Sequence, residues 1–281
     1  MHYWVFRGFP KRALSRLAGW LAGRRRPRAL LRLAIRLYVR VYRIDMAPFE
    51  GTADSFETFN AFFARPLRPG RRPIAADPDA IVSPVDGRIS ALGKIDDGRL
   101  PQVKGVHYSL GGLLAGDESW TDYLGGQFVT LYLAPPDYHR IHAPVAGMVR
   151  RFRYIPGEYW SVGPAGLSSV PRLYERNERL VTFIEAPFGA VAVIAVGAMI
   201  VGGIRVVYHP HPTGARAAGP RGETLAEPYR LEKGAELGRF ELGSSVVLLM
   251  RKGEAELRPL RPGDRLRMGE PIATLPRGAR P

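Results

Sequence analysis

The chain of 281 residues contains no cysteine. That absence excludes a disulfide framework, a thiolate zinc site and a cysteine nucleophile. It is compatible with a reducing compartment. The first thirty residues also lack a continuous apolar segment followed by a small-residue cleavage site. We therefore expect no signal peptide and no export.

Acidic residues are missing from the first 44 positions, so the charge of the chain is distributed unevenly. This segment holds 12 lysine or arginine residues, whereas the remaining 237 residues carry 29 basic and 26 acidic side chains. Within residues 28–41, arginine recurs every four positions, at Arg28, Arg32, Arg36 and Arg40, and leucines run beside it. On a helix this spacing forms one basic stripe. The pattern predicts a basic amphipathic helix.

A basic amphipathic helix suits the surface of an anionic membrane, where apolar burial and charge attraction act together. We expect residues 1–70 to form a membrane-associating helical region and residues 71–281 to form a β-rich domain. The expected location is peripheral, on the cytoplasmic face of the cell membrane. A helical face packed on the protein's own body is an alternative. We expect no nucleic-acid partner, because the rest of the chain is nearly neutral and no nucleic-acid-binding motif occurs.

The longest uncharged stretch covers residues 186–204, which include one proline, four glycines and many β-branched residues. Its length is sufficient for a membrane-spanning helix. The composition favours two buried strands separated by a turn instead.

The chain from residue 81 onward consists of short β-branched segments separated by glycine and proline, a pattern typical of strands. Strands are expected at residues 128–133, 181–184, 191–196, 204–208, 246–250 and 271–275. A further helix is expected over residues 52–63. The expected fold class is therefore α+β, with N-terminal amphipathic helices followed by a β-rich barrel or sandwich.

A weak internal repeat relates residues 83–89 to residues 143–149, which share Pro, Val and Gly at corresponding positions. Proline fixes φ, and glycine permits a turn or bulge. The repeat predicts two similar β-hairpin elements. It places Asp86 and the residues just before Ala143 in related positions.

Three segments hold side chains that can act together in a reaction. One contains Asp86, the second contains His139 and His142, and the third contains Ser244 and Ser245. A carboxylate that orients an imidazole, which in turn deprotonates a serine, is a general scheme for activating a hydroxyl. Taken singly, Asp-Gly and Gly-Ser-Ser are ordinary turn sequences. No metal site is expected, because no cysteine or acidic cluster accompanies the histidines.

Taken together, these segments resemble the motifs of bacterial, pyruvoyl-dependent phosphatidylserine decarboxylases. The resemblance covers nearly the whole chain and is carried by residues 16–20, 138–142, 171–179, 196–202 and 242–245. The family's self-cleavage segment is commonly Leu-Gly-Ser-Thr. Ser245 stands where threonine is commonest, a change that keeps the hydroxyl.

The resemblance implies a proenzyme that cuts itself between Gly243 and Ser244. It implies that Asp86, His142 and Ser244 form a charge relay for the cut, in which Gly243 permits a strained turn. Ser244 would become a covalent pyruvoyl cofactor that forms a Schiff base with the substrate amine. His139 is the implied proton donor in decarboxylation.

The implied reaction converts phosphatidylserine to phosphatidylethanolamine in phospholipid biosynthesis. The implied products of the cut, residues 1–243 and 244–281, would remain together as a heterodimer, with a higher oligomer left open. The alternative is a serine hydrolase that uses Asp86, His142 and Ser244 without self-cleavage. The sequence lacks the Gly-x-Ser-x-Gly motif of many such enzymes.

Overall fold

The computed structural model describes residues 11–103, 105–198, 203–210, 219–241 and 244–276, with side chains from residue 17 onward. The helices are α2 (Lys11–Ala22), α3 (Arg28–Val41), α4 (Phe59–Phe63), α5 (Leu110–Leu113), α6 (Pro164–Ser169), α7 (Leu173–Arg176) and the 3-10 helix η1 (Glu118–Tyr123). The first three precede every strand, as the sequence predicted.

The strands follow from Ala80 onward. They are β1 (Ala80–Val82), β2 (Gly87–Lys94), β3 (Arg99–Val103), β4 (Val106–Ser109), β5 (Gln127–Leu133), β6 (Arg140–His142), β7 (Gly147–Ile155), β8 (Arg179–Ala186), β9 (Gly189–Gly197), β10 (Ile204–Val206), β11 (Arg221–Leu231), β12 (Glu236–Phe240), β13 (Ser244–Met250), β14 (Glu256–Leu257), β15 (Arg265–Leu266) and β16 (Pro271–Thr274).

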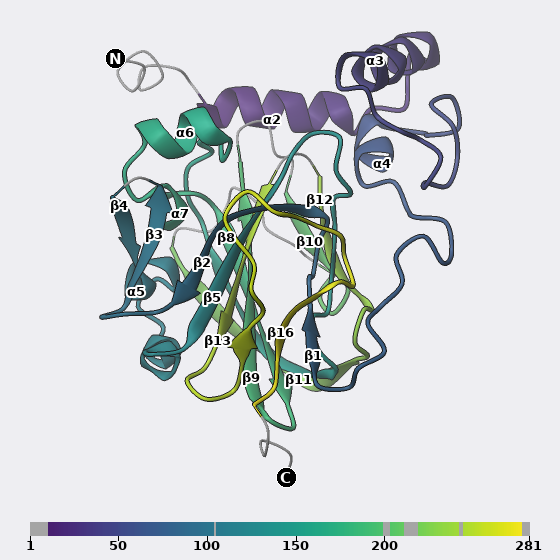
Figure 1. Cartoon of the computed structure of the whole chain (residues 1–281). Helices are drawn as coiled ribbons and strands as arrows, with labels where there is room; N and C mark the ends of the chain where they lie inside the picture. Colours follow the sequence, from purple (N-terminus) through teal and green to yellow (C-terminus); the bar gives the residue numbers. More distant parts are fainter. Residues whose placement is uncertain (1–10, 104, 199–202, 211–218, 242–243, 277–281) are drawn as a thin grey trace.

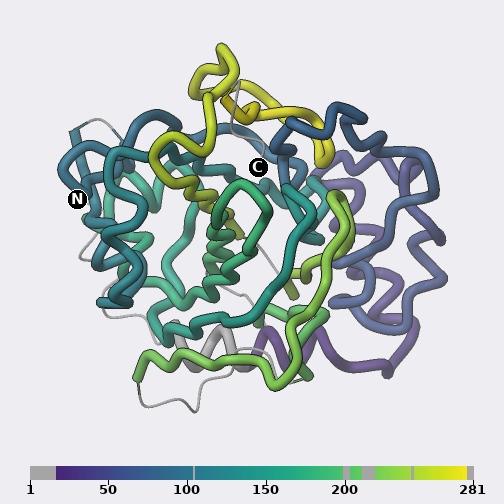
Figure 2. Tube along the Cα trace, turned by 90° about the horizontal axis from the view of Figure 1, so that it is seen from below, coloured from purple at the N-terminus to yellow at the C-terminus, as the bar shows by residue number. Residues whose placement is uncertain are grey.

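An antiparallel sheet of eight strands, in the order β11-β7-β8-β9-β13-β5-β2-β15, forms the main layer. Two three-stranded sheets, β1-β16-β14 and β10-β12-β6, contribute side chains to the core on one face of it. The other face packs against α5, α6, α7 and the β3-β4 hairpin. The α+β prediction is confirmed, with a sandwich rather than a closed barrel. Figures 1 and 2 show the strands stacked in one body with the N-terminal helices at its edge.

Strand β13 is the centre of this body. It pairs through all seven of its residues with β5 on one side and with β9 on the other, and every one of those residues is buried. The expected strand at residues 246–250 is confirmed and begins two residues earlier.

The uncharged stretch of residues 186–204 contains β9 and the start of β10, as its β-branched composition predicted. In the part of the chain that the structure describes, no helix is both long enough and apolar enough to cross a membrane.

The helix expected over residues 52–63 is wrong in its first half, because only α4 is helical. Thr52 and Ser55 form a turn in which the Ser55 hydroxyl bonds to the Thr52 carbonyl. The helix begins only after Thr58, whose side chain accepts a hydrogen bond from the Ala61 N–H as an N-cap.

Helix α2 lies across one end of the β-rich body, with α3 and α4 beside it (Figure 1). On α3, Ile35 is buried against the α4 region. Several other apolar side chains of α2 and α3 face outward: Trp20 is 55% exposed, Leu30 and Leu33 are 63% exposed, and Val41 is 62% exposed. The helices therefore use only part of their apolar surface for packing on the protein itself.

The internal repeat is confirmed, because the two copies pair reciprocally through their main chains. The Val82 N–H donates to the Pro144 carbonyl at 3.0 Å, and the His142 N–H donates to the Pro84 carbonyl at 2.8 Å. Val82 and His142 are equivalent positions of the repeat, as are the two prolines. The copies are therefore related by approximate twofold symmetry, which brings the Asp86 turn next to the strand that carries His142.

A second pair of contacts obeys the same symmetry. The Ser83 carbonyl accepts from Gly269 N–H at 3.0 Å, and the equivalent Ala143 carbonyl accepts from Gly234 N–H at 2.8 Å. Both glycines have positive φ, of 90° and 83° respectively. Each copy is thus closed by a glycine turn that a residue with a Cβ would strain.

Candidate active site

Ser244 is the first residue of β13, where it lies opposite Leu133 of β5 and Gly197 of β9. Its side chain is completely buried. Within the described residues its hydroxyl has no hydrogen-bond partner. Gly243 lies outside the described residues, so the peptide bond predicted to be cut remains a prediction. A buried hydroxyl without a partner is uncommon in a folded protein and calls for an explanation.

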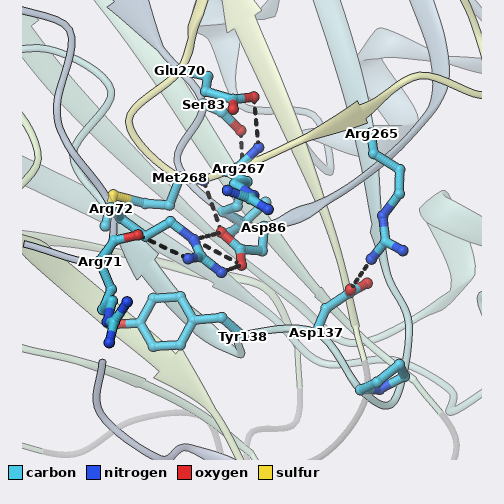
Figure 3. Close-up of polar contacts among 12 residues, drawn as sticks. Arg71, Arg72, Ser83, Asp86, Asp137, Tyr138, Arg265, Arg267, Met268 and Glu270 are labelled. Carbon is cyan, nitrogen blue, oxygen red and sulfur yellow. Dashed lines mark hydrogen bonds and ion pairs between the residues drawn. The ribbon is translucent and has the colours of Figure 1, made fainter. Parts of the chain in front are cut away.

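Asp86, in the turn between β1 and β2, forms an ion pair with Arg72. The Arg72 Nε lies 2.9 Å and 3.1 Å from the two carboxylate oxygens, and the Met268 N–H donates to Oδ1 at 2.8 Å. Figure 3 shows the carboxylate enclosed by these two residues. The carboxylate raises the pKa of Arg72, chiefly through this hydrogen bonding. Asp86 is therefore held in place by a cationic side chain and a main-chain donor.

His142 makes hydrogen bonds through both ring nitrogens. Nδ1 lies 2.7 Å from the Gly234 carbonyl oxygen, and Nε2 lies 2.9 Å from the Tyr138 hydroxyl. A carbonyl can only accept, so Nδ1 carries the proton and Nε2 accepts from Tyr138. Burial lowers the pKa of His142, which favours this neutral form.

The structure thus brings Asp86 and His142 close without the direct hydrogen bond that the charge-relay prediction implies. The Asp86 oxygens are occupied by Arg72 and by Met268 N–H, and the His142 nitrogens by Tyr138 and Gly234. Figure 3 places the Tyr138 ring beside the Arg72–Asp86 pair. The sequence did not indicate either Arg72 or Tyr138 as an intermediate, since Arg72 lies in a loop outside every motif.

His139 is completely buried and stacks on Phe63, with ring centroids 4.0 Å apart. Its Nε2 lies 3.1 Å from the Ala134 carbonyl oxygen, to which it donates, while Nδ1 has no hydrogen-bond partner within the described residues. Burial, assisted by the Arg65 guanidinium, lowers the pKa of His139 to about 3. Ala134 follows Leu133, the residue opposite Ser244. His139 is therefore a neutral imidazole whose Nδ1 has no partner among the described residues. Its Nε2 is hydrogen-bonded to the residue that follows the β5 partner of Ser244.

Acidification from pH 7 to pH 4 is expected to destabilise the wild-type protein more than a His139→Gln variant. The pKa of His139 falls from about 6.5 in the unfolded chain to about 3 on folding, so between these values only the unfolded state binds the proton. The stability that His139 contributes is thus complete above pH 6.5 and is lost as the pH falls. The expected difference in the free energy of unfolding is about 3 kcal/mol. Urea unfolding of both proteins at the two pH values measures it, and equal losses would contradict the neutral state.

A groove of about 900 Å³ opens between the helices and the body. Its walls are mainly apolar side chains of α2, α3 and α4, and they include Phe63, the stacking partner of His139, and Pro135. Arg24 and Arg26 also line it. The groove therefore combines an apolar interior with cationic groups and reaches the side chain that covers His139.

Comparison with known proteins gives a consistent result. The family model described as phosphatidylserine decarboxylase matches residues 59–274, and a model described as PSD matches residues 7–43. The protein named phosphatidylserine decarboxylase proenzyme in Anaeromyxobacter sp. (strain K) is 47% identical over 271 residues, which cover 95% of this chain and 96% of the relative. Proteins of the same name in Brevibacillus brevis and Yersinia enterocolitica are each 43% identical to this chain, and each alignment covers 94% of this chain. The alignments cover 94% of the Brevibacillus protein and 92% of the Yersinia protein.

These similarities show that the protein is an enzyme of the carboxy-lyase class. The chain belongs to the phosphatidylserine decarboxylase family, which confirms the resemblance predicted from the sequence. The relatives are named as proenzymes.

Proposed function

We propose that this chain is a self-processing enzyme that decarboxylates phosphatidylserine to phosphatidylethanolamine, after cutting itself between Gly243 and Ser244. The observation that carries the proposal is the Ser244 hydroxyl, which is buried at the start of the central strand without a hydrogen-bond partner among the described residues. Buried hydroxyl groups in folded proteins are usually paired. A serine that is consumed by reaction with its own backbone does not need a partner.

The surroundings of Ser244 fit a covalent pyruvoyl group at this position. Residue 244 lies between Leu133 and Gly197, and glycine leaves space on one side. When present, the group supplies a ketone that reacts with an amine and withdraws electrons from the carboxylate-bearing carbon. Strand β13 would hold it rigidly, because pairing on both sides fixes the backbone.

The proposed roles of the remaining residues keep the predicted division. His142, whose partner Tyr138 lies beside the Arg72–Asp86 pair, accepts the Ser244 hydroxyl proton during the cut, for which Nε2 exchanges its Tyr138 partner. His139 supplies the proton that replaces carbon dioxide. The unpartnered Nδ1 of His139 supports this role, because it is the ring nitrogen available to carry the transferred proton.

The groove and the outward-facing side chains of α2 and α3 support a lipid substrate. Apolar side chains are exposed on both helices, such as Trp20 on α2 and Leu33 on α3, and α3 also carries the arginine stripe. These helices would lie in an anionic membrane surface, with the cytoplasmic leaflet as the proposed location. A lipid could then enter the groove from the membrane and bring its headgroup toward His139.

Mass spectrometry of the purified, active protein tests the proposal. We expect two chains, one ending at Gly243 and one of 38 residues beginning at position 244. The short chain should lack a free N-terminal amine and should react with a carbonyl reagent such as phenylhydrazine. An active preparation that contains only the intact chain would refute the proposal and would favour the serine-hydrolase alternative.

A further inference from the structure

Glu178 is a buried acidic residue that the proposed mechanism does not yet use. It directly precedes β8 and is 1% exposed. The Tyr154 hydroxyl donates to its Oε1 at 2.6 Å, whereas its Oε2 has no hydrogen-bond partner among the residues described. One half of the carboxyl group is therefore fixed and the other half is free.

The position of the free oxygen is defined by Gly197. The Gly197 N–H donates to the Glu178 carbonyl at 2.8 Å, which extends the β8–β9 pairing by one residue. A Cβ atom built on Gly197 would stand 3.6 Å from Glu178 Oε2. The Glu178 carboxyl group thus occupies the side of the sheet toward which a side chain at position 197 would point.

Ser244 lies directly opposite Gly197 in the neighbouring strand pair. Side chains of directly opposed residues in antiparallel strands point to the same face of the sheet, with Cβ atoms about 5 Å apart. The Ser244 hydroxyl and the Glu178 carboxyl group therefore lie on the same face of the sheet, on either side of Gly197, which has no side chain. Each presents a buried oxygen without a partner in the described structure.

We propose that Glu178 is the general acid of self-cleavage, a role that rests on the proposed function. In the step, His142 takes the proton from Ser244 Oγ as Oγ bonds to the carbonyl carbon of the preceding residue. The C–N bond to Ser244 then breaks, and the Glu178 carboxyl group gives its proton to the departing nitrogen. One proton leaves the hydroxyl and one reaches the amine, so the peptide becomes an ester with no other reactant.

The environment of Glu178 shifts its pKa toward the protonated state that a general acid requires. Burial raises its pKa, and hydrogen bonding from Tyr154 and Tyr159 opposes that rise only in part. With Oε1 accepting from Tyr154, Oε2 is the oxygen that carries the acidic proton in this proposal. A carboxylic acid held neutral in an apolar site is a recurrent proton donor in enzymes.

Glu178→Gln tests the proposal, because it keeps the size and the acceptor of the side chain but removes the transferable proton. General acids typically contribute 10²–10⁴-fold, so we expect the rate of cutting to fall at least about 100-fold. The rate is measured on denaturing gels after synthesis of the full chain in a cell-free system. Cutting of Glu178→Gln at the wild-type rate would overturn the role of Glu178, while an uncut wild-type chain would overturn the proposed function itself.

Two further variants separate proton donation from a structural role. Tyr154→Phe removes the hydrogen bond but keeps the acid, so it should still cut at a rate within a few-fold of wild type. Gly197→Ala inserts a methyl group between Glu178 and Ser244 at ordinary contact distances, 3.4 Å from the Glu178 carbonyl oxygen. It should fold normally and cut at least about 10-fold more slowly, as an obstructed proton transfer requires. If Tyr154→Phe were as slow as Glu178→Gln, or Gly197→Ala as fast as wild type, the acid role would be wrong.

Hydroxylamine identifies the step that fails, because it cleaves esters and leaves amides intact. The Glu178→Gln chain should resist hydroxylamine, since the ester never forms without protonation of the departing nitrogen. Cutting of this variant by hydroxylamine at position 244 would show that the ester had formed and would overturn the assignment.

Discussion

Replacement of Ser244 by alanine is expected to leave a single chain of 281 residues with no measurable decarboxylase activity. The variant lacks the oxygen that attacks the preceding carbonyl, and no other described side chain at the start of β13 offers one on that face. Loss of a nucleophile that acts on its own backbone removes the reaction altogether rather than slowing it. Denaturing gels and a lipid decarboxylation assay measure the two losses.

The fold of Ser244→Ala should be unaffected, which makes the loss interpretable. The hydroxyl makes no hydrogen bond within the described residues, so its removal should change the free energy of unfolding by less than about 1 kcal/mol. Ser245→Ala is the matched control: it deletes a second buried hydroxyl one position along the strand, on the opposite face. The Ser245→Ala chain should still cut. A two-chain product from Ser244→Ala would refute the cleavage site.

The two histidines should separate the two reactions. His142→Ala is expected to remain uncut, because the Ser244 hydroxyl would lose its proposed proton acceptor and Tyr138 its partner. His139→Ala is expected to be cut but to decarboxylate about 10²–10⁴-fold more slowly, since the proposed proton donor is missing. Gels give the extent of cutting, and turnover is normalised to the amount of short chain.

A chemical control distinguishes proton donation by His139 from its packing on Phe63. His139→Gln retains a polar side chain that can bond to the Ala134 carbonyl but cannot transfer a proton near neutral pH. It should therefore be as slow as His139→Ala in decarboxylation and better folded. Failure of His139→Ala to be cut, with His142→Ala cut normally, would reverse the proposed division between the two residues.

The strands of the body were predictable because their β-branched segments are long and clearly bounded. The segment at residues 191–196 lies within β9, and that at residues 246–250 within β13, since burial on both faces selects uninterrupted apolar residues. The helix at residues 52–63 was half wrong, because a Ser55 turn and the Thr58 cap compete locally with helix formation.

The site was predictable as a set of residues but not as a set of contacts. The motifs indicated Asp86, His139, His142 and Ser244. They did not show that Arg72 holds Asp86, because that pair joins a loop to a turn and no spacing rule links the two. This is a limit of one-dimensional patterns, in which local spacing informs only about neighbours on the same element.

The spatial relation between Glu178 and Ser244 could not be predicted from the sequence. It passes through Gly197 and depends on the register of three strands, β8, β9 and β13, in one sheet. A shift of one residue in either pairing would turn one of the two side chains to the other face. Glu178 lies in a segment that carried the family resemblance, yet its sequence neighbours give no sign of this geometry.

The twofold repeat also supplies an internal comparison for the reactive residues. Val82 occupies the position equivalent to His142 and makes the equivalent main-chain hydrogen bond, and Ala146 occupies the position equivalent to Asp86. Each copy of the repeat thus has an apolar side chain at one of these two places and a reactive side chain at the other. The histidine and the aspartate each occur in only one copy of the repeat, and this difference between the copies makes a symmetric scaffold chemically asymmetric.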